Sequence, residues 1–191
     1  MNKEKAKVTI WSSSHCAPKR KFPVYFQNLF LNQNRFNTLI INAIGGQRLT
    51  SSLTDRIVDS IKNSENTQDI HVLILGDNDL RHETTVKSII ENFEKIIEYA
   101  SFKSNCVIIV CSLIHGKLYE TRLKNQFFKL DKKLRILCNS KPEYARFVNL
   151  RQHLDRDTSF ANDCVHLNAL GTKRLAETVY HAICCVPHTV A

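Results

Sequence analysis

The chain has 191 residues, of which 43% are apolar and 24% are charged, a composition typical of folded globular proteins that excludes an intrinsically disordered chain. This length suffices for one domain with a substantial core, and we expect a single domain over residues 1–191, excised from a longer protein. Lysine and arginine number 27 against 18 aspartates and glutamates, and the resulting charge of +9 favours a polyanionic partner.

Targeting and metal-binding signals are not found in the sequence. Its first residues lack the apolar core of a signal peptide, and no later run reaches the ~18 apolar residues that a membrane span needs. We therefore predict a cytoplasmic protein with no membrane partner. The seven cysteines form an odd set without CxxC or CxxH spacing, which predicts free, mostly buried thiols, no metal site and no cofactor.

Apolar runs of strand length alternate with segments of helical periodicity along the chain. The five runs cover residues 7–11, 38–44, 70–75, 105–113 and 145–150. They are continuous and rich in β-branched residues, which is typical of parallel strands covered on both faces. Between them, residues 51–62 and 88–100 repeat apolar side chains every three or four positions, as amphipathic helices do. The pattern predicts an α/β fold, a three-layer α/β/α arrangement with a five-stranded parallel sheet of the flavodoxin-like type.

Polar and glycine-containing segments follow the predicted strands, at the edge of the sheet where functional loops gather. Acyl transfer needs a hydroxyl nucleophile, an imidazole base, a carboxylate to orient the imidazole, and donors for the oxyanion. The residues that fill these roles are Ser14 as nucleophile, His166 as base, Asp163 as its orienting partner, and the Gly46 N–H and Asn78 amide as oxyanion donors. Taken singly, Ser14 is more typical of a turn and His166 of a loop; their combination favours a catalytic site.

The order of these segments resembles the SGNH, or GDSL-type, hydrolase family. The serine block at 12–15, the glycine block around Gly45 and Gly46, the G-x-N-D block at 76–79 and the D-x-x-H block at 163–166 occur in the family's order. The resemblance implies the SGNH-hydrolase fold. One departure matters, because Ser12-Ser13-Ser14 stands where the family has Gly-Asp-Ser, and an altered turn can misplace the nucleophile.

The basic charge and the altered serine block are most similar to the C-terminal (OSK) domain of the Oskar family of insect germ-plasm proteins. That resemblance implies RNA binding without efficient catalysis, with single-stranded RNA or mRNA 3′ regions as partner, in cytoplasmic ribonucleoprotein granules. Basic side chains suit phosphate backbones, and Tyr25, Phe127 and Tyr144 are candidates for base stacking. The predicted RNA-binding residues are Lys19, Arg20, Lys21, Arg122, Lys124, Lys129, Lys132, Lys133, Arg135, Arg146, Arg151 and Arg156.

Other interpretations remain open at the level of sequence. The main alternative is an active serine esterase that uses Ser14, His166 and Asp163. A third is a protein-interaction scaffold whose basic face meets acidic partners. Protein partners in a ribonucleoprotein granule are a further expectation from the Oskar resemblance, and a competing kinship is with the SGNH-like esterase domains of some retrotransposon proteins. A charge run is also common on an ordinary solvated face. For Asp79 we predict a structural role, and we give His15 and Cys16 little weight as catalytic groups.

Overall fold

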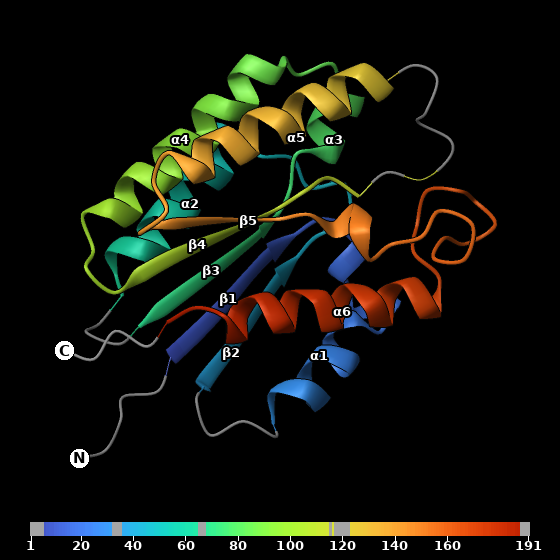
Figure 1. The fold of residues 1–191 in the computed structure, drawn as a ribbon, viewed down its shortest axis with the longest axis horizontal. Helices are drawn as coiled ribbons and strands as arrows, with labels where there is room; N and C mark the ends of the chain where they lie inside the picture. Colours follow the sequence, from blue (N-terminus) through green and yellow to red (C-terminus); the bar gives the residue numbers. More distant parts are fainter. Residues whose placement is uncertain (1–5, 32–35, 65–67, 115, 117–122, 188–191) are drawn as a thin grey trace.

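A five-stranded parallel sheet forms the centre of the computed structural model, which describes residues 6–31, 36–64, 68–114, 116 and 123–187. The strand order is β2-β1-β3-β4-β5, and every neighbouring pair is parallel (Figure 1). The strands are β1 (Ala6–Ser12), β2 (Phe36–Ala43), β3 (Asp69–Ile74), β4 (Cys106–Cys111) and β5 (Ala145–Val148). The predicted α/β fold with a five-stranded parallel sheet is confirmed.

Two layers of helices cover the sheet. On one face lie α2 (Ser51–Lys62), α3 (Asp77–Arg81), α4 (Val86–Ser101) and α5 (Lys124–Asn139), and on the other lie α1 (Phe22–Phe30) and α6 (Ala169–Cys184) (Figure 1). Thr50 and Thr85 begin α2 and α4 by accepting the backbone N–H of Leu53 and Ser88. Such caps satisfy amide groups that the first turn leaves unbonded, which explains why both helices begin at a threonine.

Each face of the sheet contributes to its own core. Trp11 and Leu73 pack with α2, α4 and α5, while Ile10 and Val72 pack with α1 and α6. Since successive residues of a strand point to opposite faces, both sets must be apolar when helices cover both sides. This is the physical reason for the continuous apolar runs in the sequence.

The strand ends differ slightly from the predicted ranges. The run predicted over 145–150 ends as a strand at Val148, because Leu150 opens the 3₁₀ turn η4 (Leu150–Gln152). Leu150 is nevertheless fully buried, and its N–H donates to the Ser112 hydroxyl at 2.9 Å. Its apolar character therefore reflects burial in the core and not strand geometry.

The cysteines agree with the prediction of free, mostly buried thiols. All seven are free, and Cys16, Cys106, Cys111 and Cys138 are buried. Among the helices in the described part of the chain, none has the length and apolar character required to cross a bilayer.

Candidate functional site

The serine turn lies at the carboxyl end of the central strand β1. Ser12 and Ser13 are buried, whereas Ser14 is partly exposed and opens the 3₁₀ turn η1 (Ser14–Cys16). Of the three consecutive serines, Ser14 is therefore the one that a substrate could reach. Burial raises the pKa of the Cys16 thiol to about 12, so this neighbouring cysteine stays protonated and is a poor nucleophile at neutral pH.

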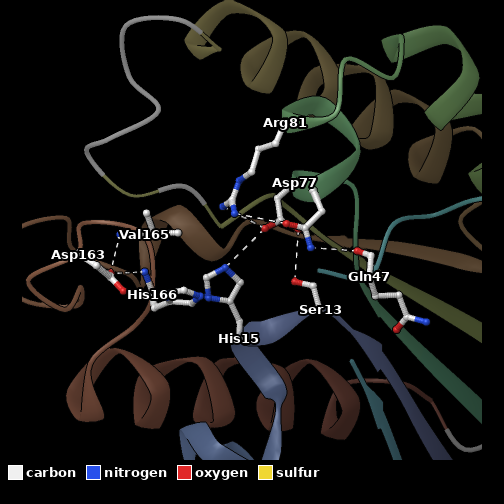
Figure 2. A network of polar contacts seen from close by, with 9 residues as sticks. Ser13, His15, Gln47, Asp77, Arg81, Asp163, Val165 and His166 are labelled. Carbon is white, nitrogen blue, oxygen red and sulfur yellow. Dashed lines mark hydrogen bonds and ion pairs between the residues drawn. The ribbon is translucent and has the colours of Figure 1, made fainter. Parts of the chain in front are cut away.

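A histidine–aspartate pair precedes helix α6. The His166 Nδ1 lies 2.7 Å from the Asp163 Oδ2, and the Asp163 Oδ1 accepts the backbone N–H groups of Val165 and His166, both at 2.9 Å (Figure 2). Hydrogen bonds from the His166 backbone and side chain and from the Val165 backbone lower the pKa of Asp163. The carboxylate is therefore ionised at neutral pH and holds the proton on Nδ1, which leaves Nε2 as the basic nitrogen of the ring.

Contacts between distant segments bring the predicted blocks together. The His166 ring centroid lies 6.0 Å from that of His15, the residue after Ser14. Ser13 donates to the Asp77 carboxylate at 3.5 Å, which joins the end of β1 to the end of β3. Asn78, next in the chain, donates to the Gln47 carbonyl at 3.1 Å and so reaches the loop after β2 (Figure 2). The serine, glycine, G-x-N-D and D-x-x-H blocks thus meet at one edge of the sheet.

Of the two predicted oxyanion donors, Asn78 belongs to this cluster, and Gly46 directly precedes Gln47, which Asn78 contacts. Asn78 uses its amide nitrogen toward the Gln47 carbonyl and accepts from Arg81 at 3.3 Å, so its amide plane is held on both sides. A primary amide carries two N–H bonds, and a bond to Gln47 leaves the second for a substrate oxygen. Gly46 has a φ of 74°, a left-handed conformation that glycine adopts without strain, and no atom would lie within 4 Å of an added Cβ.

Residues that we did not predict complete the polar cluster. Asp77 is buried, with its Oδ2 3.6 Å from the His15 Nε2 and 3.4 Å from the Arg81 Nη2. Burial acts to raise the pKa of Asp77, but the neighbouring His15 and Arg81 outweigh it and hold the pKa below its usual value. The available signal in the sequence was an aspartate shortly after a buried strand, at the variable position of the G-x-N-D block.

Asp79 has the structural role that we predicted for it. Its Oδ2 accepts the backbone N–H of Leu49 at 2.9 Å, inside the protein, which fixes the loop between β2 and α2. Within the described ranges, no group of three or more histidine, cysteine, aspartate or glutamate side chains is arranged to hold a metal ion.

The predicted RNA-binding residues do not form one surface. Lys19, Arg20 and Lys21 lie directly before α1, on one side of the sheet. On the other side, the helix α5 carries Lys124, Lys129, Lys132, Lys133 and Arg135 (Figure 1). Arg146 lies on β5, Arg151 in η4 and Arg156 in the loop that follows, while Arg122 lies outside the described residues.

Several of these arginines have partners within the protein. Arg146 donates to the Cys185 carbonyl at 2.8 Å, and the Arg135 guanidinium lies 5.2 Å from the Phe147 ring. Arg151 pairs with Asp131 and lies over the Phe128 ring. Of the aromatic candidates for base stacking, Phe127 is wholly buried in the core, whereas Tyr25 and Tyr144 are partly exposed.

Comparison with known proteins finds similar structures but no similar sequences. No protein-family profile and no curated protein sequence matches the chain. Among solved structures, a lipolytic protein of the G-D-S-L family from Veillonella parvula covers 95% of this chain and 100% of its own, with a TM-score of 0.77 and 12% identity. A carbohydrate acetylesterase from Sinorhizobium meliloti gives a TM-score of 0.73 at 10% identity, over 96% of this chain and 100% of its own. A family 3 carbohydrate esterase from Talaromyces cellulolyticus gives 0.71 at 13% identity, over 94% and 96%.

The chain has the fold of the SGNH hydrolases. The comparisons support the resemblance to this family, and none of the three structures named above is an Oskar protein. The predicted RNA-binding, germ-plasm and developmental function is wrong: the structures that share this fold include esterases and lipolytic proteins. The physical reason for the error is that a basic sequence segment does not reveal which face its side chains occupy or which partners neutralise them.

Proposed function

We propose that this SGNH-fold protein is a serine hydrolase of carboxylic esters, with Ser14 as nucleophile, His166 as base and Asp163 as its orienting residue. The observation that carries the proposal is the 2.7 Å contact between His166 and Asp163, in a loop whose imidazole lies beside the serine turn. An ionised carboxylate on Nδ1 prepares Nε2 to accept a proton, which is the requirement for activating a hydroxyl.

The reaction has two balanced halves. The Ser14 oxygen attacks the ester carbonyl while its proton passes to the His166 Nε2, and collapse of the tetrahedral intermediate breaks the bond to the alcohol, which takes that proton. Water then attacks the acyl-serine, gives its proton to His166, and the acid leaves as Ser14 recovers the proton. The Gly46 N–H and the second amide hydrogen of Asn78 stabilise the negative oxygen in both halves.

A hollow next to the His166 loop has both apolar and charged walls. It has a volume of about 470 Å³; its apolar lining includes Ile114, Leu154 and Phe160, and its charged lining is Arg151, Asp155, Arg156 and Asp157. Phe160 pairs with Leu167, directly after His166, which connects the hollow to the catalytic loop. We propose that the hollow receives an acyl or alcohol group with apolar character.

The test compares the wild-type protein with Ser14→Ala and Asp163→Asn on p-nitrophenyl acetate and butyrate. We expect Ser14→Ala to lower kcat/KM at least about 10³-fold and Asp163→Asn about 10²- to 10⁴-fold, because nucleophile, base and orienting group act as a unit. The matched control is Ser88→Ala, an equivalent deletion at an exposed serine in the first turn of α4. Equal turnover by wild type and Ser14→Ala would contradict the proposal.

A further inference from the structure

We propose that Asp77 is the positioning residue of the serine turn, because its carboxylate holds the residues on both sides of Ser14 and thereby directs the Ser14 hydroxyl toward His166. The inference deepens the proposed esterase function and rests on it. Asp77 touches neither substrate nor the reacting atoms in this scheme, since it acts through Ser13 and His15.

The two carboxylate oxygens of Asp77 are divided between the two neighbours of Ser14. The Asp77 Oδ1 accepts from the Ser13 hydroxyl at 3.5 Å, and the Asp77 Oδ2 lies 3.6 Å from the His15 Nε2 (Figure 2). Ser13, His15 and Asp77 are 0%, 2% and 4% exposed, so these contacts are shielded from water. Ser14 between them is partly exposed.

The local sequence does little to fix this turn by itself. The turn η1 has three residues and no side-chain cap, and it is closed by a backbone bond from the Ala17 N–H to the Ser14 carbonyl at 3.3 Å. A 3₁₀ turn this short is weakly determined by its own hydrogen bonds. Tertiary contacts must therefore place the turn, and these are the packing of Cys16 in the core and the contact to a buried carboxylate.

Opposite charge adds to the contact between Asp77 and the serine turn. Arg81, one helical turn later on α3, lies 3.4 Å from the same Oδ2 that faces His15. With its pKa held below the usual value, Asp77 is an anion at neutral pH in a nearly water-free site. Electrostatic attraction is much less screened there than at the surface, and removal of the anion leaves the buried Ser13 hydroxyl without this acceptor.

The same network extends to both catalytic partners of Ser14. The His15 ring that faces Asp77 also faces the His166 ring, with the centroids 6.0 Å apart. Arg81, which pairs with Asp77, also donates to the Asn78 side chain, the predicted oxyanion donor. One carboxylate thus links the nucleophile's turn to the base on one side and to the oxyanion donor on the other.

The first experiment measures ester hydrolysis by Asp77→Asn and by the exchange variant Ser13→Asp/Asp77→Ser. Asparagine keeps the shape but removes the charge, so we expect kcat to fall about 10- to 100-fold with KM changed less than about threefold. The exchange variant returns a carboxylate to the same buried contact. We expect its kcat to be at least about tenfold higher than that of Asp77→Asn. Wild-type kcat in Asp77→Asn, or no recovery in the exchange variant, would overturn the proposal.

The second experiment measures amide hydrogen exchange, which does not depend on activity. In Asp77→Asn we expect faster exchange in residues 12–17, while the matched control Asp79→Asn accelerates exchange in residues 45–50, because Asp79 holds Leu49. Unchanged exchange at 12–17, or equal effects of the two variants there, would overturn the proposal. If Asp77→Asn fails to fold, Ser13→Ala removes one of the two contacts with less disturbance, and the same local acceleration is expected.

The two experiments separate failure of this inference from failure of the proposed function. An inactive wild-type protein in which Asp77→Asn still loosens residues 12–17 would remove the esterase function and, with it, the positioning role that depends on it. An active, Ser14-dependent wild type in which Asp77→Asn changes neither kcat nor exchange would remove only the role of Asp77.

Discussion

Single buried polar residues set how this protein responds to acid, and His71 is the clearest case. Its ring is wholly buried at the centre of β3, where the Nδ1 accepts the indole N–H of Trp11 at 3.2 Å. Burial, with a smaller contribution from Lys7, lowers the pKa of His71 from 6.5 to about 4. The unfolded chain therefore binds the proton before the folded protein does, so stability is complete above about pH 6.5 and is lost progressively toward pH 4.

Because of the buried His71, we expect the free energy of unfolding to fall by up to about 3 kcal/mol as the pH drops from 7 to 4. Urea denaturation at several pH values measures this free energy. In His71→Gln, which keeps a hydrogen-bond acceptor for Trp11 but cannot gain a proton, the profile should be flatter by that amount. Parallel profiles for the two proteins would show that His71 does not titrate between these limits.

At the scale of elements, close packing of glycines holds the loop between β5 and α6 in place. A Cβ on Gly116 would overlap the Cys164 carbonyl, and one on Gly171 would overlap the Ser159 carbonyl. Asn168 adds to this by accepting the Gly171 N–H at 2.9 Å and donating to the Thr158 carbonyl at 2.8 Å. The segment that carries Asp163 and His166 is therefore located by backbone contacts on both of its sides.

The corresponding prediction concerns Gly116→Ala. The added methyl group must push the Cys164 backbone away, and Cys164 lies between Asp163 and His166, so we expect kcat/KM to fall about 100-fold and stability by about 1–3 kcal/mol. Gly45→Ala is a matched control for stability, since nothing lies within 4 Å of its added Cβ. Equal effects of the two substitutions on thermal unfolding would show that the contact with Cys164 does not cause the loss of stability in Gly116→Ala.

At the scale of the whole molecule, stability comes from two apolar layers on opposite faces of one sheet. The layer under α1 and α6 contains a series of packed rings, in which Phe22 and Phe26 lie 5.5 Å apart, Phe26 and Phe30 6.2 Å, and Phe30 and Phe36 5.0 Å. Phe26 also meets the edge of Tyr180 on α6 at 6.4 Å. These rings connect α1 and β2 with α6, which lies far from both in the sequence.

We expect Phe26→Ala to lower the free energy of unfolding by about 3–5 kcal/mol, because it removes a buried ring and leaves a cavity. Phe102→Ala, at a ring that is 74% exposed, should cost less than about 0.5 kcal/mol. Chemical denaturation of both variants makes the comparison. Similar losses in the two would mean that the ring series contributes little beyond an ordinary surface aromatic.

Much of the architecture follows from the sequence alone. Residues 51–62 were predicted as a helix and form α2 over that range, because an apolar residue every three or four positions suits one face of a helix and Thr50 caps its start. The five apolar runs became the five strands for a similarly local reason. The order of the serine, glycine, G-x-N-D and D-x-x-H blocks also located the segments that meet at the sheet edge.

Only the tertiary structure decided what surrounds Ser14 and where the charges lie. The contact between Ser13 and Asp77 joins residues 64 positions apart, and no periodicity within either segment indicates it. The basic residues before α1 and those on α5 look alike in sequence, yet the sheet separates them. Local patterns determine helices and strands because those depend on neighbours along the chain, whereas a site and a surface depend on residues that only folding brings together.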